Sequence, residues 1–314
     1  MKKIANSIFS VHFDIVHGCQ LRCIGCPNST LEPFVKRIAV EDFDRGLRNI
    51  DVERIHTLRL FNYGEPLLHK RLPEILKCIP RQSWKASIVE ISTNAQTVYW
   101  ESFEEAIKLE IVNRLVVSCD GDGTPEDYER LRPPSRWSRL IEFLDRVREM
   151  RDKWAPAMQL ATRTVCNPDP PENRERWRQI LQSRGWTPEF RRWMNLPDSA
   201  ANLTGRFMTV PEGACGYLAP SEAFVGHPWH GQINLLYVDY DGTVVPCCQH
   251  PRAGTLGNLF ESTYNEILQS STRENFIRFM DKNRRSMPVC SSCDAGPIGN
   301  EGPSFRAAND LAPV

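Results

Sequence analysis

A six-fold alternation of strand and helix constrains the fold of this chain more than any other feature. Between residues 9 and 193, short β-prone runs alternate with stretches of helical periodicity. This order predicts βαβ units, a parallel sheet and a partial (β/α)6 barrel, whose chemistry would sit at the C-terminal ends of the strands. We expect the strands at residues 9–15, 56–61, 87–92, 114–118, 157–165 and 187–192. We expect the helices at residues 40–50, 69–79, 98–109, 136–152 and 172–183.

The last third of the chain has a different pattern. Prolines and glycines are scattered from residue 197 to residue 228, which predicts a linker or an irregular cover. Within residues 233–246, Asp241-Gly242 separates two β-prone runs and predicts a β-hairpin. Helical segments are expected near residues 263–281. The expected parts of this α/β chain are a barrel at 1–193, a linker at 194–214, a small module at 215–295 and a tail at 296–314.

Composition excludes two classes of partner. Lys+Arg and Asp+Glu both number 39, so the chain lacks the basic footprint of a nucleic-acid-binding protein. No apolar run approaches the roughly 18 residues of a membrane span, and the first residues lack the apolar stretch of a signal peptide. We therefore expect a cytoplasmic protein with no nucleic-acid or membrane partner.

Eleven cysteines stand out against this ordinary composition, and most of them are clustered. In a reducing compartment, clustered thiols are metal ligands or redox groups more often than disulfides. Cys19, Cys23 and Cys26 form a C-x3-C-x2-C run directly after the first expected strand. Three thiolates on one loop can hold three irons of a [4Fe–4S] cube and leave the fourth iron open. The alternative is a zinc site, which would need a distant fourth ligand.

The sequence resembles the radical S-adenosylmethionine (SAM) superfamily, whose hallmark is this cysteine loop. Three segments that follow successive expected strands resemble the cofactor motifs of that family: Tyr63-Gly64-Glu65-Pro66, Ser92-Thr93-Asn94 and Ser118-Cys119-Asp120-Gly121. The resemblance implies that the open iron binds the amino and carboxylate groups of SAM. It implies that the first segment holds the SAM amino group, that the second contacts the ribose and carboxylate, and that the third lines the same pocket. Tyr63 replaces a glycine of the family motif, so this residue must tolerate the backbone conformation with a side chain.

A second set of cysteines follows the barrel. Four thiolates complete a closed [4Fe–4S] cluster with no open iron; they are Cys215, Cys247, Cys290 and Cys293. Together with Leu256-Gly257-Asn258-Leu259, they resemble the twitch module, a truncated relative of the SPASM domain that holds one auxiliary cluster. The gap between Cys215 and Gly242 is long for that module, which leaves Cys248 as the other candidate for the first ligand. A zinc ribbon in a binding protein is the non-enzymatic alternative.

If those four cysteines are the ligands, Cys248 remains as a free thiol beside the cluster. The family's 5′-deoxyadenosyl radical takes a hydrogen atom from an unactivated C–H bond. Because an S–H bond is weak relative to a C–H bond, Cys248 could return a hydrogen atom on the opposite face and invert the stereocentre. This arrangement resembles radical SAM epimerases, both the aminoglycoside type such as neomycin C epimerase and a peptide type.

We therefore expect a radical SAM enzyme that epimerises a carbinol carbon of a sugar or aminocyclitol natural product. Cys248 is the expected hydrogen donor, with Cys166 as the rival thiol, and Arg163 is expected to orient a substrate hydroxyl or carboxylate. With no domain before the first strand to capture a leader peptide, a small substrate is favoured over a ribosomal peptide. The expected partner is an electron donor such as flavodoxin or ferredoxin. The alternative reaction is oxidation of a secondary alcohol to a ketone, with the second cluster taking an electron.

Overall fold

The computed structural model describes residues 5–31, 34–166, 170–191, 193, 196–201, 215, 218 and 235–293. A nine-stranded sheet runs through it in the order β11-β10-β9-β1-β4-β5-β6-β7-β8. The six strands of the barrel are mutually parallel and lie within two residues of the expected bounds. They are β1 (Ser7–Phe13), β4 (Arg54–Arg59), β5 (Lys85–Thr93), β6 (Arg114–Ser118), β7 (Gln159–Val165) and β8 (Thr187–Arg191).

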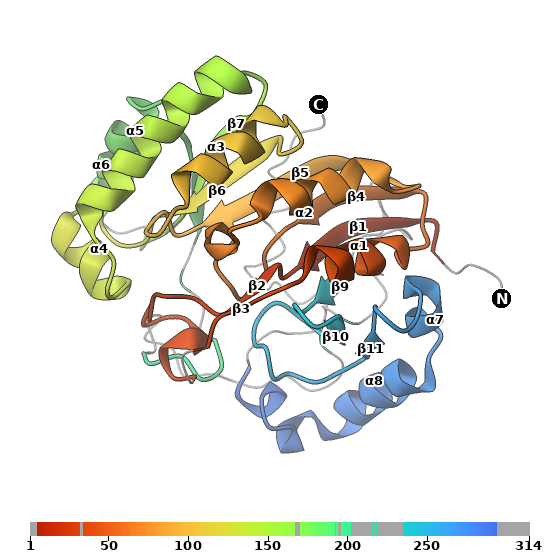
Figure 1. Ribbon diagram of the computed structural model, residues 1–314. Helices are drawn as coiled ribbons and strands as arrows, with labels where there is room; N and C mark the ends of the chain where they lie inside the picture. The colour runs from red at the N-terminus through yellow and green to blue at the C-terminus, as the bar shows by residue number, and fades with distance from the viewer. Residues whose placement is uncertain are drawn as a thin grey trace, which may run out of the picture.

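The connecting helices agree with the expected ones, and Figure 1 shows α1, α2, α3 and α5 in front of the sheet. They are α1 (Val40–Arg48), α2 (Leu72–Cys78), α3 (Trp100–Lys108), α5 (Trp137–Trp154) and α6 (Glu172–Gln182). The sequence did not predict α4 (Pro125–Leu131). It begins where the Thr124 hydroxyl accepts a hydrogen bond from the Asp127 amide and Pro125 occupies the first helical position.

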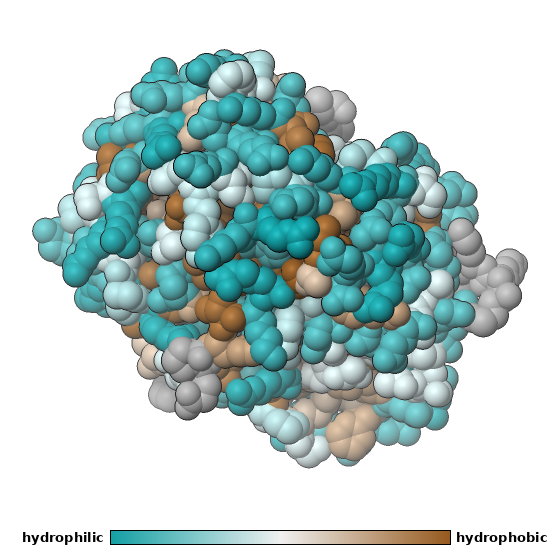
Figure 2. All heavy atoms as spheres, viewed as in Figure 1, coloured by the Kyte–Doolittle hydropathy of each residue, from teal (hydrophilic) through white to brown (hydrophobic). Residues whose placement is uncertain are grey.

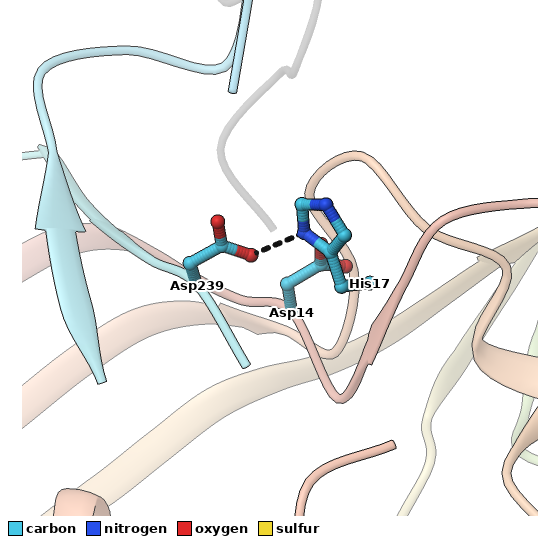
Figure 3. A group of neighbouring side chains, drawn as sticks. All are labelled: Asp14, His17 and Asp239. Carbon is cyan, nitrogen blue, oxygen red and sulfur yellow. Dashed lines mark hydrogen bonds and ion pairs between the residues drawn. The ribbon is translucent and has the colours of Figure 1, made fainter. Parts of the chain in front are cut away.

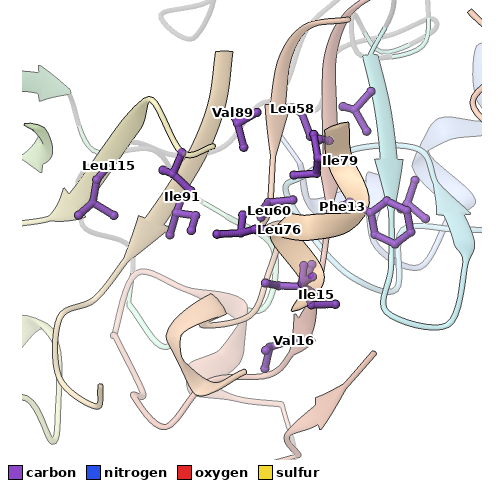
Figure 4. Close-up of a cluster of buried hydrophobic side chains, with 14 of the residues drawn as sticks. Phe13, Ile15, Val16, Leu58, Leu60, Leu76, Ile79, Val89, Ile91 and Leu115 are labelled. Atoms are coloured by element: carbon purple, nitrogen blue, oxygen red, sulfur yellow. The ribbon is translucent and has the colours of Figure 1, made fainter. Parts of the chain in front are cut away.

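Apolar side chains between the sheet and these helices form the core, part of which Figure 4 shows. Phe13 of β1 meets Phe43 of α1 edge to face, with ring centroids 5.0 Å apart. Side chains alternate across a strand, so the residues between the core positions point away from the helices. We call that opposite side the inner face; it carries Ser10, His12, Arg59, Glu90, Ser92, Arg114, Ser118, Arg163 and Tyr237.

The C-terminal module continues the barrel sheet. Strand β9 (Leu235–Val238) pairs in parallel with β1, and β10 (Thr243–Val245) returns antiparallel to β9 through the expected turn at Gly242, whose φ is +81°. Strand β11 (Gly257–Asn258) pairs with β10, and helices α7 (Tyr264–Leu268) and α8 (Ser271–Asn283) follow (Figure 1). Because β9 lies against β1, the residues after β10 reach the barrel itself.

Shorter elements complete the described parts of the chain. They are β2 (Val16–His17), β3 (Lys36–Arg37), η1 (Pro27–Ser29), η2 (Pro66–Leu68), η3 (Ile79–Arg81), η5 (Arg284–Ser286) and η6 (Cys290–Ser292). The expected linker at 194–214 falls mostly, and the expected tail at 296–314 wholly, outside the described residues.

The face of the molecule in Figure 2 is mainly hydrophilic, with hydrophobic residues scattered over it. Among the helices that the structure describes, none combines the length and apolar character needed to cross a bilayer.

Candidate functional site

The loop that carries Cys19, Cys23 and Cys26 follows β2 and is tied to the barrel by main-chain hydrogen bonds. The Arg22 amide donates to the Pro133 carbonyl at 2.6 Å, and the Ile24 amide donates to the Leu131 carbonyl at 3.0 Å. All three cysteines are half-buried and form no disulfide bond. The loop after α4 therefore fixes the cysteine loop at the C-terminal end of the strands, as the sequence predicts.

The surroundings of these thiols suit an iron–sulfur cluster. Burial raises the pKa of Cys23 to about 12, against the lowering effect of the Arg132 guanidinium. Cluster binding must therefore displace protons, and Arg132 offsets part of the thiolate charge. The side-chain amide of Asn94 also donates a hydrogen bond to the Cys19 sulfur at 3.2 Å.

Glu65 joins two of the predicted cofactor segments. Its Oε1 accepts hydrogen bonds from the Leu67 amide at 3.0 Å and the Thr93 hydroxyl at 2.7 Å, while Oε2 accepts one from the Asn94 amide at 2.7 Å. Burial raises the pKa of Glu65 to about 7. Glu65 also caps η2, which begins at Pro66. The first and second segments are thus one connected unit beside Cys19.

Gly64 is required by close packing. A Cβ atom at this position would lie 1.5 Å from the Val16 carbonyl oxygen. Only glycine lets the segment approach β2 this closely.

Asp14, which sequence reasoning missed, fixes the main chain of the same segment. Its carboxylate accepts hydrogen bonds from the amides of Asn62 at 3.1 Å, Tyr63 at 3.4 Å and Gly64 at 3.2 Å. Burial, with Asp239 nearby, raises the pKa of Asp14 to about 7. A buried acid within the apolar run Phe13-Asp14-Ile15-Val16 was the available signal.

His17 links the cysteine loop to the C-terminal module, as Figure 3 shows. Its Nδ1 lies 2.8 Å from Oδ1 of Asp239, directly after β9, and 3.9 Å from Asp14. These three side chains are close enough to hold an ion. Because both Asp14 oxygens already accept main-chain hydrogen bonds, we interpret the group as structural.

The third predicted segment supports the site through Arg132. The buried Asp120 carboxylate pairs with the Arg132 guanidinium, which acts electrostatically on Cys23 and Glu65. Ser118 lies on the inner face, in register with Arg163, and Ser92 is in register with Val116. Sequence reasoning missed Arg132, because one arginine directly after the charged segment Pro125–Leu131 carries no distinguishing signal.

The second set of cysteines surrounds one pocket. Its lining includes all four predicted ligands, Cys215, Cys247, Cys290 and Cys293, together with Met280 and Arg284. Arg284 donates to the carbonyls of Cys290 at 3.4 Å and Cys293 at 3.1 Å. Cys248 does not line this pocket. Of the two candidates for the first ligand, the structure therefore groups Cys215 with the other three thiols.

Cys248 instead faces the barrel. The Tyr237 hydroxyl bonds to its sulfur, and the guanidiniums of Arg59 and Arg163 lie close enough to lower its pKa, although burial raises that pKa overall. The rival Cys166 bonds to Arg174 of α6. Cys119 and Cys78 are buried in the core between sheet and helices. Of the thiols outside the two predicted ligand sets, only Cys248 is described beside the inner face.

Arg163 is where the sequence placed it, on the fifth barrel strand and on the inner face. Its guanidinium lies 2.6 Å from Glu90 and stacks 5.5 Å from the centre of the Phe61 ring. Arg163 thus pairs with an acid and also lies at the inner face beside Cys248.

Comparisons with known proteins agree with this arrangement. The family model of the radical SAM superfamily matches residues 14–179, and that of SPASM, an iron–sulfur cluster-binding domain, matches residues 230–294. No match was found among curated proteins.

Solved structures share the fold over nearly the whole chain. The structure of anSMEcpe with bound AdoMet has 13% identity and a TM-score of 0.60, covering 96% of this chain and 95% of that chain. BtrN in complex with AdoMet and 2-DOIA has 16% identity and a TM-score of 0.52, covering 96% and 98%. The complex of anSMEcpe with AdoMet and Cp18Cys peptide has 12% identity and a TM-score of 0.59, covering 96% and 95%. At these identities the likeness concerns the fold alone.

Proposed function

The chain belongs to the radical SAM superfamily and carries a SPASM iron–sulfur domain behind the barrel, and from this premise we propose that it is an epimerase. Its substrate would be a sugar or aminocyclitol natural product in which one C–H stereocentre is inverted. The observation that carries the proposal is the position of Cys248, which lies beside the inner face and outside the pocket of the four predicted ligands.

Membership of the radical SAM superfamily implies SAM and a [4Fe–4S] cluster, and the SPASM domain implies further iron–sulfur binding. When bound, SAM supplies a 5′-deoxyadenosyl radical that removes a hydrogen atom from a substrate C–H bond. Cys19, Cys23 and Cys26 would hold the first cluster, with the thiolate charge offset by Arg132. Glu65 would accept a hydrogen bond from the SAM amino group, since its carboxylate is buried beside the cysteine loop.

Four residues would hold a single auxiliary cluster, and they are Cys215, Cys247, Cys290 and Cys293. Arg284, bonded to the carbonyls of Cys290 and Cys293, would fix the last two ligands relative to each other.

Cys248 would complete the inversion. Its S–H bond breaks, a C–H bond forms on the far face of the substrate carbon, and a thiyl radical remains on Cys248. One electron and one proton restore the thiol. The electron comes from a donor such as flavodoxin or ferredoxin, and Tyr237, which bonds to this sulfur, is placed to relay the proton.

The alternative reaction is oxidation. In that case the substrate radical would lose one proton and one electron to give a ketone, and a cluster held by the second set of cysteines would supply an acceptor for that electron. Cys247 next to Cys248 keeps that cluster near the inner face, which favours this alternative. Among the similar structures, BtrN was solved with 2-DOIA and anSMEcpe with a peptide. The peptide complex supports a second substrate alternative, in which the chain is a peptide epimerase.

Turnover in D2O separates these reactions. Reconstituted enzyme, SAM and a reductant are mixed anaerobically with a small-molecule extract of the cells that make the protein, and metabolites are followed by mass spectrometry. Epimerisation predicts one product that gains one deuterium through the exchangeable Cys248 thiol.

Two variants complete this test. Cys248→Ala should abolish the labelled product, whereas Cys166→Ala should retain it, because Cys166 bonds to Arg174 away from the inner face. An unlabelled product two hydrogens lighter than its precursor, formed equally by Cys248→Ala, would establish oxidation instead.

A further inference from the structure

A continuous row of polar side chains crosses the inner face beside Cys248. Tyr237 of β9 is in register with His12 of β1, His12 with Arg59 of β4, and Arg59 with Glu90 of β5. Arg114 of β6 is the next partner of Glu90. In a parallel sheet, partners in register share a face, so this row lies under the place where the substrate must meet Cys248.

Glu90 lies within ion-pair distance of three arginines of the inner face. The nearest nitrogens of Arg59 and Arg163 lie 3.1 Å and 2.6 Å from Oε1 of Glu90, and Nε of Arg114 lies 3.5 Å from its Oε2. Glu90 is fully buried. The carboxylate therefore acts as the fixed centre that orients the guanidiniums.

The guanidiniums of Arg59 and Arg163 have N–H donors that make no hydrogen bond to the described residues. A guanidinium offers five N–H groups, and Arg163 directs only one nitrogen to Glu90, with no further hydrogen-bond partner among the described residues. Arg59 directs Nε to Glu90 and one terminal nitrogen to Ser10 and His12. The side chains are 27% and 19% exposed, for Arg163 and Arg59 respectively, so they reach open space from the inner face.

The charge of this group is positive. Four arginines face two carboxylates, because Glu189 of β8 pairs with both Arg114 and Arg191. His12 adds no charge, since burial and the nearby Arg59 hold its pKa well below the usual 6.5. A site with excess positive charge disfavours a cationic amino sugar and favours an oxyanion, which a guanidinium fork binds with two parallel hydrogen bonds.

We infer that the substrate carries an oxyanion, a phosphate ester or a carboxylate, which Arg59 and Arg163 bind on the inner face beside Cys248. The inference rests on the proposed function, because it names the substrate class of the same site. It also explains why Arg163 lies next to both Glu90 and Cys248: the acid orients the guanidinium, and the guanidinium places the substrate carbon within reach of the thiol.

Charge fractionation tests this inference without knowledge of the substrate. A small-molecule extract of the producing cells is separated by ion exchange into cationic, neutral and anionic pools. Each pool is given to the reconstituted enzyme with SAM and reductant, and 5′-deoxyadenosine above the pool-free background is measured. We expect at least a tenfold stimulation by the anionic pool alone. Phosphatase treatment of that pool removes the stimulation if the anion is a phosphate ester and preserves it if the anion is a carboxylate.

Variants connect the response to the two arginines. Arg59→Gln and Arg163→Gln should each reduce the stimulation at least tenfold, and Arg163→Lys should recover part of it because the charge returns. Arg148→Gln removes an equal charge from the outer helix α5, where Arg148 pairs with Asp152, and should respond as the wild type. Iron content verifies that each variant is assembled.

Two results overturn the inference in different ways. Stimulation by the neutral or cationic pool would refute the oxyanion and leave the epimerase proposal standing, as would an anionic response unaffected by both glutamine variants. If no pool raised 5′-deoxyadenosine above background in a fully loaded enzyme, the proposed small-molecule function itself would fail.

Discussion

The hydroxyl of Tyr63 donates a hydrogen bond to the main-chain carbonyl of Cys247. Tyr63 belongs to the segment that Asp14 fixes beside the cysteine loop, and Cys247 lines the pocket of the second cysteine set. One side chain thus joins the two predicted cluster sites, at a position where the family motif has glycine. The substitution introduces no strain, since Tyr63 is not among the described residues with positive φ.

Tyr63→Phe should weaken the second cluster selectively. The change keeps the ring and removes one hydrogen bond, which contributes about 1 kcal/mol, or roughly a fivefold change in an equilibrium. We expect about half of the iron to be lost to a chelator several-fold faster than in the wild type. Tyr240→Phe is the matched control, because the Tyr240 ring packs against His17 at a tilted angle and its hydroxyl has no hydrogen-bond partner in the described part of the chain. Equal rates for both variants would mean that the Tyr63 bond does not hold the cluster.

Gly64→Ala should strongly weaken SAM binding. The added Cβ would overlap the Val16 carbonyl oxygen at 1.5 Å, so the segment must move away from β2 and carry Glu65 with it. We expect at least a tenfold loss of SAM affinity, measured by equilibrium dialysis with reconstituted enzyme.

A second glycine provides the control. Gly185 has positive φ, at +76°, whereas Gly64 does not, and the nearest contact to a Cβ added at Gly185 is 3.7 Å away. Gly185→Ala should cost about 1 kcal/mol of stability through the backbone and leave SAM affinity unchanged. If both alanine variants lost affinity alike, general destabilisation and not close packing at Gly64 would be the cause.

The barrel could be predicted from the sequence because each βα unit carries its own periodic signal. β6 has the predicted bounds, and the other barrel strands deviate by at most two residues. Helix α4 was missed, although Thr124-Pro125 is a recognisable helix start. The pairing of β9 with β1 is a contact between distant segments, which no local pattern encodes.

The residues of the candidate site also fall into two groups, those that local sequence patterns reveal and those that depend on the fold. The motifs that carry cysteines and turn residues were visible, because their spacing is local. Arg132, Asp14 and the Glu90 group were not, because their roles arise only when neighbouring strands bring separate side chains together. The choice between Cys215 and Cys248 also depended on three-dimensional grouping.

Glu90→Gln should destabilise the fold by an amount that does not vary between pH 6 and pH 8. Burial alone would raise the pKa of Glu90, but Arg163, Arg59 and Arg114 lower it from 4.5 to about 2. A carboxyl with a lowered folded-state pKa stabilises the fold above pH 4.5 and loses that contribution as the pH falls toward 2. The stabilisation is about 3 kcal/mol, which corresponds to a Tm lower by about 6 °C.

Thermal unfolding under anaerobic conditions at pH 6, 7 and 8 measures this difference. Glu274→Gln, which removes an exposed carboxylate paired with Arg278 on α8, should leave Tm unchanged. A Glu90→Gln deficit that appeared only toward pH 8 would show that Glu90 titrates near neutrality, contrary to its position among three guanidiniums.

Cys215→Ala and Cys248→Ala should differ in iron content. Cys215 lines the pocket with the other three thiols, whereas Cys248 bonds to Tyr237 and lies near Arg59. A four-iron cube that loses one of its four thiolates is held poorly, so Cys215→Ala should carry about four irons after anaerobic reconstitution, and Cys248→Ala about eight. Iron and acid-labile sulfide, counted per chain, measure both. If Cys248→Ala were the variant with four irons, Cys248 would be a ligand, its sulfur would have no hydrogen atom to donate, and the inversion would need another donor.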